Sequence, residues 1–191
     1  MKEVCLDIAN PLTYIFNLSF STGVVPDSLI LAKVIPIYKK GDRNDPGNYG
    51  LISLLTVVDK IMEKLMCKQL YNFLELHKIL YEFQFGFRKC HSTILALMEV
   101  LDNIYHHLDR REFIIDIYLD LQKAFDTVNH DILLYKLQNY GVRGIVNQWF
   151  KSYLSGRKQI TSIRDSYSDI GSVTVGDLRV QFLDQYCFFS I

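Results

Sequence analysis

The stretch Ile114–Asp126, IIDIYLDLQKAFD, determines how the rest of the chain is interpreted. Residues 113–119 are a run of apolar, mostly β-forming residues, which predicts a short buried strand that ends at Asp120. Side chains alternate between the two faces of a strand, so Asp116, Tyr118 and Asp120 are expected on one face. A helix is predicted to follow over residues 124–140, stopped by Gly141.

Asp120 is the candidate for chemistry in this stretch. A carboxylate at the end of a buried strand is costly unless a cation or a hydrogen-bond network compensates it. Backbone amides near residues 122–124, where the helix begins, can hold a phosphate. A carboxylate beside such a turn suits a magnesium–triphosphate site. The alternative is that Asp120 only caps the helix, and the stretch by itself does not separate the two interpretations.

A second candidate segment follows a strand predicted over residues 32–38, where Pro36 favours an edge position. Four cations surround the transition from this strand to the polar loop over residues 39–50: Lys33, Lys39, Lys40 and Arg43. They predict phosphate contacts through Coulomb attraction and counterion release. The alternative is a solvated loop in which Asp42 and Asp45 pair with these cations.

A third candidate segment is EFQFGFRKCHST, residues 82–93. Phe85 and Phe87 flank Gly86, and Arg88 and Lys89 follow directly. Aromatic residues interleaved with basic ones predict stacking on bases and neutralisation of a nucleic-acid backbone. The alternative is that the two rings anchor a loop to the core.

Composition sets limits on these interpretations. The chain has 191 residues, 49% hydrophobic and 13% aromatic, with a formal net charge of zero. A neutral chain is not a dedicated nucleic-acid coat, so any such contact must come from local clusters. The four cysteines are widely spaced, which argues against a zinc site or disulfide framework and favours a reducing compartment. With no secretory signal or spanning segment visible, we expect an intracellular protein, in cytoplasm or nucleus, without a membrane partner.

Periodicity predicts the remaining elements. Helices are expected over residues 11–22, ended by Gly23, and over 57–80, 92–107 and 145–154. The helix over 92–107 has Ser92 as its N-cap and is expected to pack an apolar face inward. Further strands are expected over 159–163 and 172–175. This mixture indicates an α+β fold.

Taken in order, these segments resemble the reverse transcriptase domain of non-LTR (LINE-type, jockey-like) retrotransposons. The resemblance covers nearly all of the chain up to Gly176. QFGFR and ST (residues 84–93) followed by LDLQKAFDTVNH (119–130) form its most specific combination. It is also carried by four further segments: PLTYIFNLSFSTGVVPDSLILAKVIPIYKKGD (11–42), NYGLISLLTVVDKIMEKLMCKQLYNFL (48–74), DILLYKLQNYGVRG (131–144) and WFKSYLSGRKQ (149–159).

The resemblance implies a right-hand polymerase fold with an RNA template, a DNA primer and deoxynucleoside triphosphates as partners. Asp120 looks like the first catalytic carboxylate and a ligand for Mg²⁺. The resemblance implies triphosphate or metal contacts for Leu121, Lys123, Ala124, Lys39 and Lys40, and a steric gate against ribose for Phe125. It implies nucleic-acid contacts for Arg43, Gln84, Phe85, Arg88 and Lys89.

The sequence departs from the family pattern in three places. Gly50 and Leu51 stand where the family has Arg-Pro, which is expected to cost about 2–5 kcal/mol of nucleotide affinity if that arginine makes a buried, charge-paired contact. The pattern is lost abruptly over residues 177–191, as a frameshift would produce. No pair of adjacent aspartates is present. We therefore expect residues 1–176 to be a partial domain, comprising the fingers and first part of the palm, with the second half of the palm and the thumb missing. A non-catalytic nucleic-acid-binding remnant is the alternative.

Overall fold

The computed structural model describes residues 2–120, 128–163 and 166–173. It divides into two compact units: Met1–Lys68 with Phe125–Ile191, called here the sheet unit, and Gln69–Ala124, called the α3 unit. The helices are α1 (Lys2–Thr22), α2 (Val57–Leu76), α3 (Thr93–Asp109), α4 (His130–Asn139) and α5 (Ile145–Leu154), with 3-10 turns at Asp27–Leu29 and Pro46–Asn48. The strands are β1 (Leu31–Tyr38), β2 (Tyr49–Leu54), β3 (Lys158–Ile163), β4 (Ser166–Tyr167) and β5 (Gly171–Ser172).

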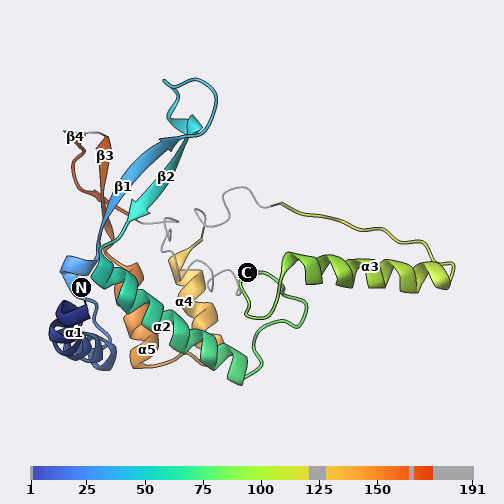
Figure 1. Ribbon diagram of the computed structural model, residues 1–191, viewed down its shortest axis with the longest axis horizontal. Helices are drawn as coiled ribbons and strands as arrows, with labels where there is room; N and C mark the ends of the chain where they lie inside the picture. Colours follow the sequence, from blue (N-terminus) through green and yellow to red (C-terminus); the bar gives the residue numbers. More distant parts are fainter. Residues whose placement is uncertain (1, 121–127, 164–165, 174–191) are drawn as a thin grey trace. The chain divides into compact units, whose positions relative to one another are not determined.

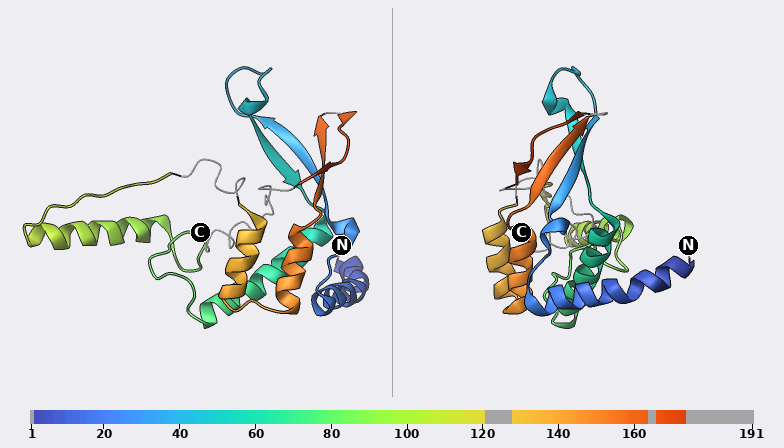
Figure 2. Two further views of the ribbon diagram at one scale, coloured as in Figure 1. Left: turned by 180° about the vertical axis from the view of Figure 1, so that it is seen from behind. Right: turned by 90° about the vertical axis from the view of Figure 1, so that its left-hand side faces the viewer.

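The sheet has the order β2-β1-β3-β4, with β5 also paired to β3 (Figure 1). β1 and β2 form an antiparallel hairpin in which Lys33 faces Leu54 and Tyr38 faces Tyr49. β1 and β3 are parallel, because the chain passes through the helices before it returns to the sheet. The hairpin extends beyond the part of β1 that β3 pairs, which leaves its tip in solvent (Figure 2).

The core of the sheet unit is built on α5. Trp149, Phe150, Tyr153 and Leu154 are each at most 1% exposed. The Trp149 ring stacks on Tyr153 with centroids 5.1 Å apart and meets Phe20 of α1 edge-on. Other buried side chains come from the neighbouring helices: Phe16 of α1, Met62 and Met66 of α2, and Leu133 and Leu137 of α4. The helices α1 and α4 both contact α5.

Hydrogen bonds fix the turn between α1 and the sheet against α5. The Trp149 Nε1–H donates to Ser19 Oγ at 3.0 Å, and Ser19 Oγ donates to the Val24 carbonyl at 2.6 Å. Gly23 ends α1 with φ +70°, and a Cβ there would lie 3.0 Å from the Ile145 carbonyl oxygen. Only glycine combines this backbone conformation with so close an approach, which confirms the helix end predicted at this residue.

Several predicted elements are confirmed, with different bounds. α5 has its predicted span, α3 matches the helix expected over 92–107, and the Ser92 side chain accepts a hydrogen bond from the Leu95 amide as its N-cap. α1 begins nine residues before Pro11, and α2 ends at Leu76 rather than residue 80. β2 was not predicted, because residues 49–54 follow directly on a loop rich in Gly, Asp and Asn. β1 is paired on both sides at residues 33 and 34, where it lies between β2 and β3. Pro36 lies beyond the part of β1 that β3 pairs, so no backbone donor is needed from it toward β3.

The helix predicted over residues 124–140 is α4, and it begins only at His130. Asn129 caps it, with Oδ1 accepting from the amides of Asp131 and Ile132. Residues 128–129 are not helical, and 124–127 lie outside the described residues. The cap explains the late start, because the Asn129 backbone is extended and its side-chain Oδ1, in place of carbonyls of a preceding turn, accepts from the first amides of the helix. For the strand expected over 172–175, the structure has β5 at 171–172, and 174–175 are likewise not described.

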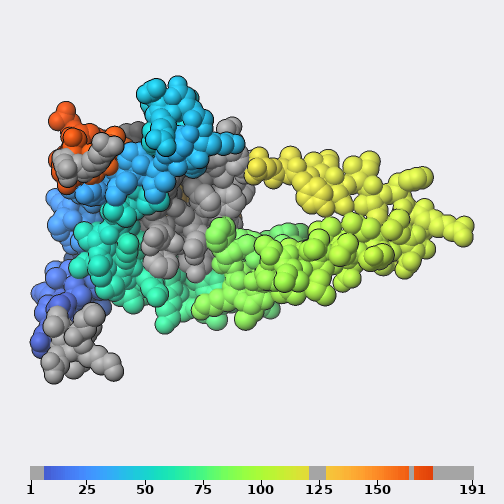
Figure 3. Space-filling model, turned by 45° about the horizontal axis from the view of Figure 1, so that its top comes forward, coloured from blue at the N-terminus to red at the C-terminus, as the bar shows by residue number. Residues whose placement is uncertain are grey.

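The predicted buried strand over residues 113–119 is wrong for this structure. The segment is extended, belongs to no strand, and makes no hydrogen bond to another described residue. Phe113 is 103% exposed and Leu119 85%. A strand exists only with a partner, and β propensity supplies none. Within the α3 unit, Figure 3 shows open space between this segment and α3.

The inward packing predicted for α3 is also wrong. None of its side chains is buried, and its apolar residues Ile94, Leu97, Met98 and Leu101 are all exposed. The periodicity of the helix was correct, but no described element covers its apolar face. Among the described residues, no helix is both long enough and apolar enough to cross a bilayer.

Candidate nucleic-acid interface

The tip of the β1–β2 hairpin is a loop held in one conformation by its own polar groups. Asp42 Oδ1 accepts from the Asn44 amide at 2.9 Å, and Asp45 Oδ1 accepts from the Gly47 amide at 2.8 Å. Asn48 Nδ2 donates to the Asp42 carbonyl at 2.9 Å. Both carboxylates thus serve backbone turns, as Asp commonly does in loops.

The cations of the hairpin are therefore left without acidic partners. Among the described residues, no ion pair joins Lys39, Lys40 or Arg43 to a carboxylate. The predicted alternative, in which Asp42 and Asp45 neutralise these cations, is not what the structure shows. The tip presents three cationic side chains on an ordered scaffold, as a phosphate-binding surface requires.

Two tyrosines frame this tip. Tyr38 and Tyr49 face each other across the two strands, with their rings edge-on at 5.6 Å. The Arg43 guanidinium lies 5.3 Å from the Tyr38 ring centroid, a cation–π distance. The Tyr38 hydroxyl donates to the Gly41 carbonyl, and the Tyr49 hydroxyl donates to the Arg43 carbonyl. Sequence reasoning missed both tyrosines. Tyr38 could have been found as the last residue of a predicted strand beside the cations, whereas Tyr49 begins a strand that was not predicted.

Gly50 has a direct consequence for Lys39. A Cβ at Gly50 would lie 2.5 Å from Lys39 Cε, so the lysine side chain occupies the space that a larger residue would fill. Gly50 thus leaves room for the side chain of a neighbouring cation.

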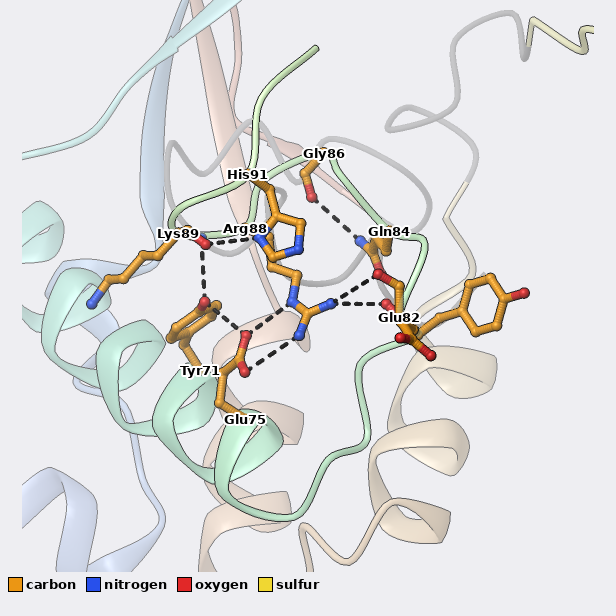
Figure 4. A network of polar contacts seen from close by, with 9 residues as sticks. Tyr71, Glu75, Glu82, Gln84, Gly86, Arg88, Lys89 and His91 are labelled. Carbon is orange, nitrogen blue, oxygen red and sulfur yellow. Dashed lines mark hydrogen bonds and ion pairs between the residues drawn. The ribbon is translucent and has the colours of Figure 1, made fainter. Parts of the chain in front are cut away.

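Arg88 is the centre of a polar network in the α3 unit (Figure 4). Its Nε donates to Glu75 Oε1 at 3.0 Å, and its Nη1 donates to the Tyr81 carbonyl at 2.9 Å. The Tyr71 hydroxyl donates to the same Glu75 oxygen at 2.8 Å. The hydrogen bond from Arg88 is the main cause that holds the pKa of Glu75 below its usual value. Arg88 thereby fixes the 81–91 loop to α2. The contact of Arg88 with nucleic acid stays a prediction.

The other predicted residues of this loop lie on its surface. The Lys89 amide donates to the Tyr71 hydroxyl at 3.3 Å, and the Lys89 ammonium lies 5.3 Å from the Tyr71 ring centroid. Gln84 Nε2 donates to the Gly86 carbonyl at 3.5 Å. The Phe85 ring lies against His91, with centroids 5.6 Å apart. Tyr71 and Glu75 were missed as parts of this network, although their i, i+4 spacing on a predicted helix was a usable signal.

Asp120 lies at the end of the exposed segment 113–120. Leu121, Lys123, Ala124 and Phe125, which the resemblance links to metal and triphosphate, lie outside the described residues. Within the described parts of the chain, no three or more His, Cys, Asp or Glu side chains gather as a metal site would require. Among the described residues Asp120 supplies one carboxylate of this site, whereas a two-magnesium site needs several converging oxygen ligands.

The candidate residues fall into two separate groups. Lys39, Lys40 and Arg43 belong to the sheet unit, whereas Gln84, Phe85, Arg88, Lys89 and Asp120 belong to the α3 unit.

Comparison with known proteins places this fold in a class. The family described as reverse transcriptase (RNA-dependent DNA polymerase) matches residues 37–175, and the chain belongs to this family. The match contains the hairpin cations, the Arg88 loop and Asp120.

The similar proteins are polymerases of mobile elements. A probable RNA-directed DNA polymerase from transposon BS of Drosophila melanogaster is 32% identical over 82% of this chain and 17% of its own length. The RNA-directed DNA polymerase from mobile element jockey of the same species is 36% identical over 65% of this chain and 14% of its own. A probable RNA-directed DNA polymerase from transposon X-element of that species is 30% identical over 94% and 20%. The chain therefore resembles a non-LTR retrotransposon polymerase domain and spans no more than a fifth of these relatives.

Proposed function

We propose that this chain forms the fingers and the first part of the palm of a retrotransposon RNA-directed DNA polymerase. An RNA template, a DNA primer and deoxynucleoside triphosphates are its proposed partners. The observation that carries the proposal is the ordered hairpin tip, which lies within the family match and presents Lys39, Lys40 and Arg43 without acidic partners. Residues 1–176 are proposed to form this partial domain, with a separate tail over 177–191.

The hairpin is proposed to act by electrostatic positioning. Lys39 and Lys40 follow directly on β1, so the sheet holds their backbone in place while their ammonium groups reach solvent. Arg43, held over Tyr38, adds a planar donor that suits phosphate. In the α3 unit, Lys89 and Phe85 supply a cation and a ring for a single-stranded template, and Arg88 holds their loop.

Asp120 is proposed as one ligand of a magnesium ion, with Leu121, Lys123, Ala124 and Phe125 around the triphosphate as in the family. Bound magnesium would supply a Lewis acid for the primer hydroxyl and the leaving pyrophosphate. The described residues do not complete such a site, and the sequence has no pair of adjacent aspartates. We therefore propose that these 191 residues are catalytically incomplete on their own.

In a primer-extension assay with Mg²⁺, the chain is expected to add no nucleotides. The reason is that one carboxylate does not hold two metal ions in the required geometry. An Asp120→Asn variant should be indistinguishable from the unsubstituted chain. Extension that disappears in Asp120→Asn would show that the chain is complete and would overturn this part of the proposal.

Binding to single-stranded RNA should depend steeply on salt and on the hairpin cations. Replacing Lys39, Lys40 and Arg43 together with alanine should reduce the slope of log affinity against log salt by ~2, because each lost phosphate contact removes about 0.7 for a single strand. Titration of a labelled RNA at several salt concentrations measures the slope.

The matched control removes the same charge elsewhere. Lys68, Lys151 and Arg110 are exposed cations on or beside helices, and their triple alanine variant should retain the slope. Equal losses in both triple variants would mean that net charge, and not the hairpin, governs binding. Binding that survives without extension would favour the nucleic-acid-binding remnant.

A further inference from the structure

A second group of charged side chains lies in the interior of the sheet unit, away from the hairpin tip. Asp59 and Glu63 of α2 are 1% and 0% exposed, and Arg157, between α5 and β3, is 5% exposed. Ions so deeply buried are strongly destabilising unless opposite charges and hydrogen bonds compensate them. Their contacts therefore show how the unit tolerates them.

Each buried carboxylate has hydrogen bonds on one of its two oxygens. Asp59 Oδ2 accepts from the Thr56 amide at 3.1 Å and from Thr56 Oγ1 at 2.7 Å. Glu63 Oε1 accepts from the Tyr153 hydroxyl at 2.9 Å. The Arg157 guanidinium lies over the Tyr153 ring, 4.4 Å from its centroid. Tyr153 thus contacts both the Glu63 carboxylate and the Arg157 guanidinium.

The remaining polar atoms of this group include both hydrogen-bond acceptors and hydrogen-bond donors. Asp59 Oδ1 and Glu63 Oε2 are buried acceptors without a partner, and Arg157 Nε and Nη2 are buried donors without one. His130 Nε2, at the start of α4, is a fifth such atom. Among the described residues no ion pair joins Arg157 to either carboxylate, so their pairing requires side-chain rotations or a shared bridging group.

The electrostatics agree with this geometry. Burial is the main cause that raises the pKa of Glu63 to about 7, and the hydrogen bond from Tyr153 and then the Arg157 charge oppose that rise. Burial likewise raises the pKa of Asp59, against the two hydrogen bonds from Thr56 and, after them, the Arg157 charge. The pKa of His130 is lowered by burial first and then by Arg157. Asp59 and Lys60 of α2 and Tyr153 of α5 are the other groups that face Glu63.

We propose that Arg157 is the shared counter-ion of Asp59 and Glu63, and that this buried ionic cluster fastens the start of α2 to the α5–β3 junction. Thr56, which holds Asp59, comes two residues after β2, and Arg157 directly precedes β3. The cluster therefore links the bases of both strands that flank β1 (Figure 1). This role is independent of the polymerase reaction.

A double-mutant cycle in the full chain tests the pairing. Arg157→Met should raise the unfolding equilibrium constant by at least about 100-fold, because two buried carboxylates lose their counter-ion. The double variant Glu63→Gln, Arg157→Met should lose less stability than Arg157→Met alone. The reason is that it no longer carries the buried Glu63 charge that Arg157→Met leaves without a counter-ion. Arg157→Lys, which keeps the charge, should be intermediate. Additive costs in the double variant would overturn the proposal.

The dependence of stability on pH is a second test, because a cluster that acted only through packing would not change it. Glu63 binds its proton more tightly in the folded state, so its contribution to stability is full below about pH 4.5 and is lost as pH rises towards about 7. Glu63→Gln should remove this fall. Glu75→Gln is the matched control, because the pKa of Glu75 is lowered and its contribution is lost in the opposite direction, as pH falls.

Titration of ¹³C-labelled glutamate by NMR makes the test independent of cooperative unfolding. One carboxyl signal, absent in Glu63→Gln, should titrate near pH 7 in the unsubstituted chain. The same signal should titrate at higher pH in Arg157→Met, because the positive charge that opposes the rise in the Glu63 pKa is then removed. A Glu63 signal that titrates at the ordinary glutamate value would show that it is not part of a buried cluster.

Discussion

Replacing Trp149 with alanine is expected to destabilise the chain by ~3–5 kcal/mol, more than a hundredfold in the unfolding equilibrium constant. Trp149 is fully buried and packs on Phe20, Phe150 and Tyr153. Its removal leaves a large cavity where α1 and α5 meet. It also removes the indole N–H that donates a hydrogen bond to the Ser19 hydroxyl oxygen.

Denaturant unfolding followed by far-ultraviolet circular dichroism measures this effect, since Trp149 is the only tryptophan and its fluorescence is lost in the variant. Trp149→Phe should cost much less, because a ring remains and Ser19 still donates to the Val24 carbonyl. Tyr135→Ala, at an aromatic side chain that is 66% exposed, is the matched control and should cost little. A loss below about 1 kcal/mol for Trp149→Ala would contradict the core described here.

Introducing charge into the exposed segment 113–120 is expected to convert a self-associating chain into one that is largely monomeric. Phe113, Ile115, Ile117, Tyr118 and Leu119 are all at least 78% exposed, on an extended backbone that makes no hydrogen bonds with other described residues. An exposed apolar strand with free amides and carbonyls is a template for pairing with another copy. Ile115→Glu with Ile117→Glu should block that pairing.

Sedimentation velocity over a range of concentrations measures the change. Ile132→Glu with Tyr135→Glu is the matched control, because these exposed side chains lie on α4, whose backbone bonds are internal. That control should self-associate as the unsubstituted chain does. If both double variants become monomeric, added charge alone is responsible; if the unsubstituted chain is monomeric with a sharp thermal transition, the exposed segment is not an association site.

Local signals in the sequence were sufficient for most helices and for the hairpin strand β1. Gly23, Ser92 and Gly156 mark helix boundaries through backbone freedom and capping, which depend on neighbouring residues alone. Residues 113–119 show where local signals fail. Their propensity for a strand is strong, but a strand needs a partner with free hydrogen-bonding groups, and the sequence of the segment contains no information about one.

The candidate site shows the same division. The residue types around Lys39, Arg88 and Asp120 were recognisable from their order and spacing, and the family match confirms the resemblance that they carried. Spacing did not reveal that Asp42 and Asp45 serve the backbone, or that Glu75 holds Arg88, because hydrogen-bond partners depend on three-dimensional distance.

By itself, the sequence determined that this protein is a reverse transcriptase family member with a mixed helical and sheet fold, because motif order, capping and periodicity are read along the chain. Only the tertiary structure decided which charged side chains pair with other protein groups and which do not. Among the described residues, it left the hairpin cations without an ion pair, bound Arg88 to Glu75 and to its own loop, and buried Asp59, Glu63 and Arg157. The reason is that burial and pairing set the energy of a charge, and both arise when segments distant in sequence pack together.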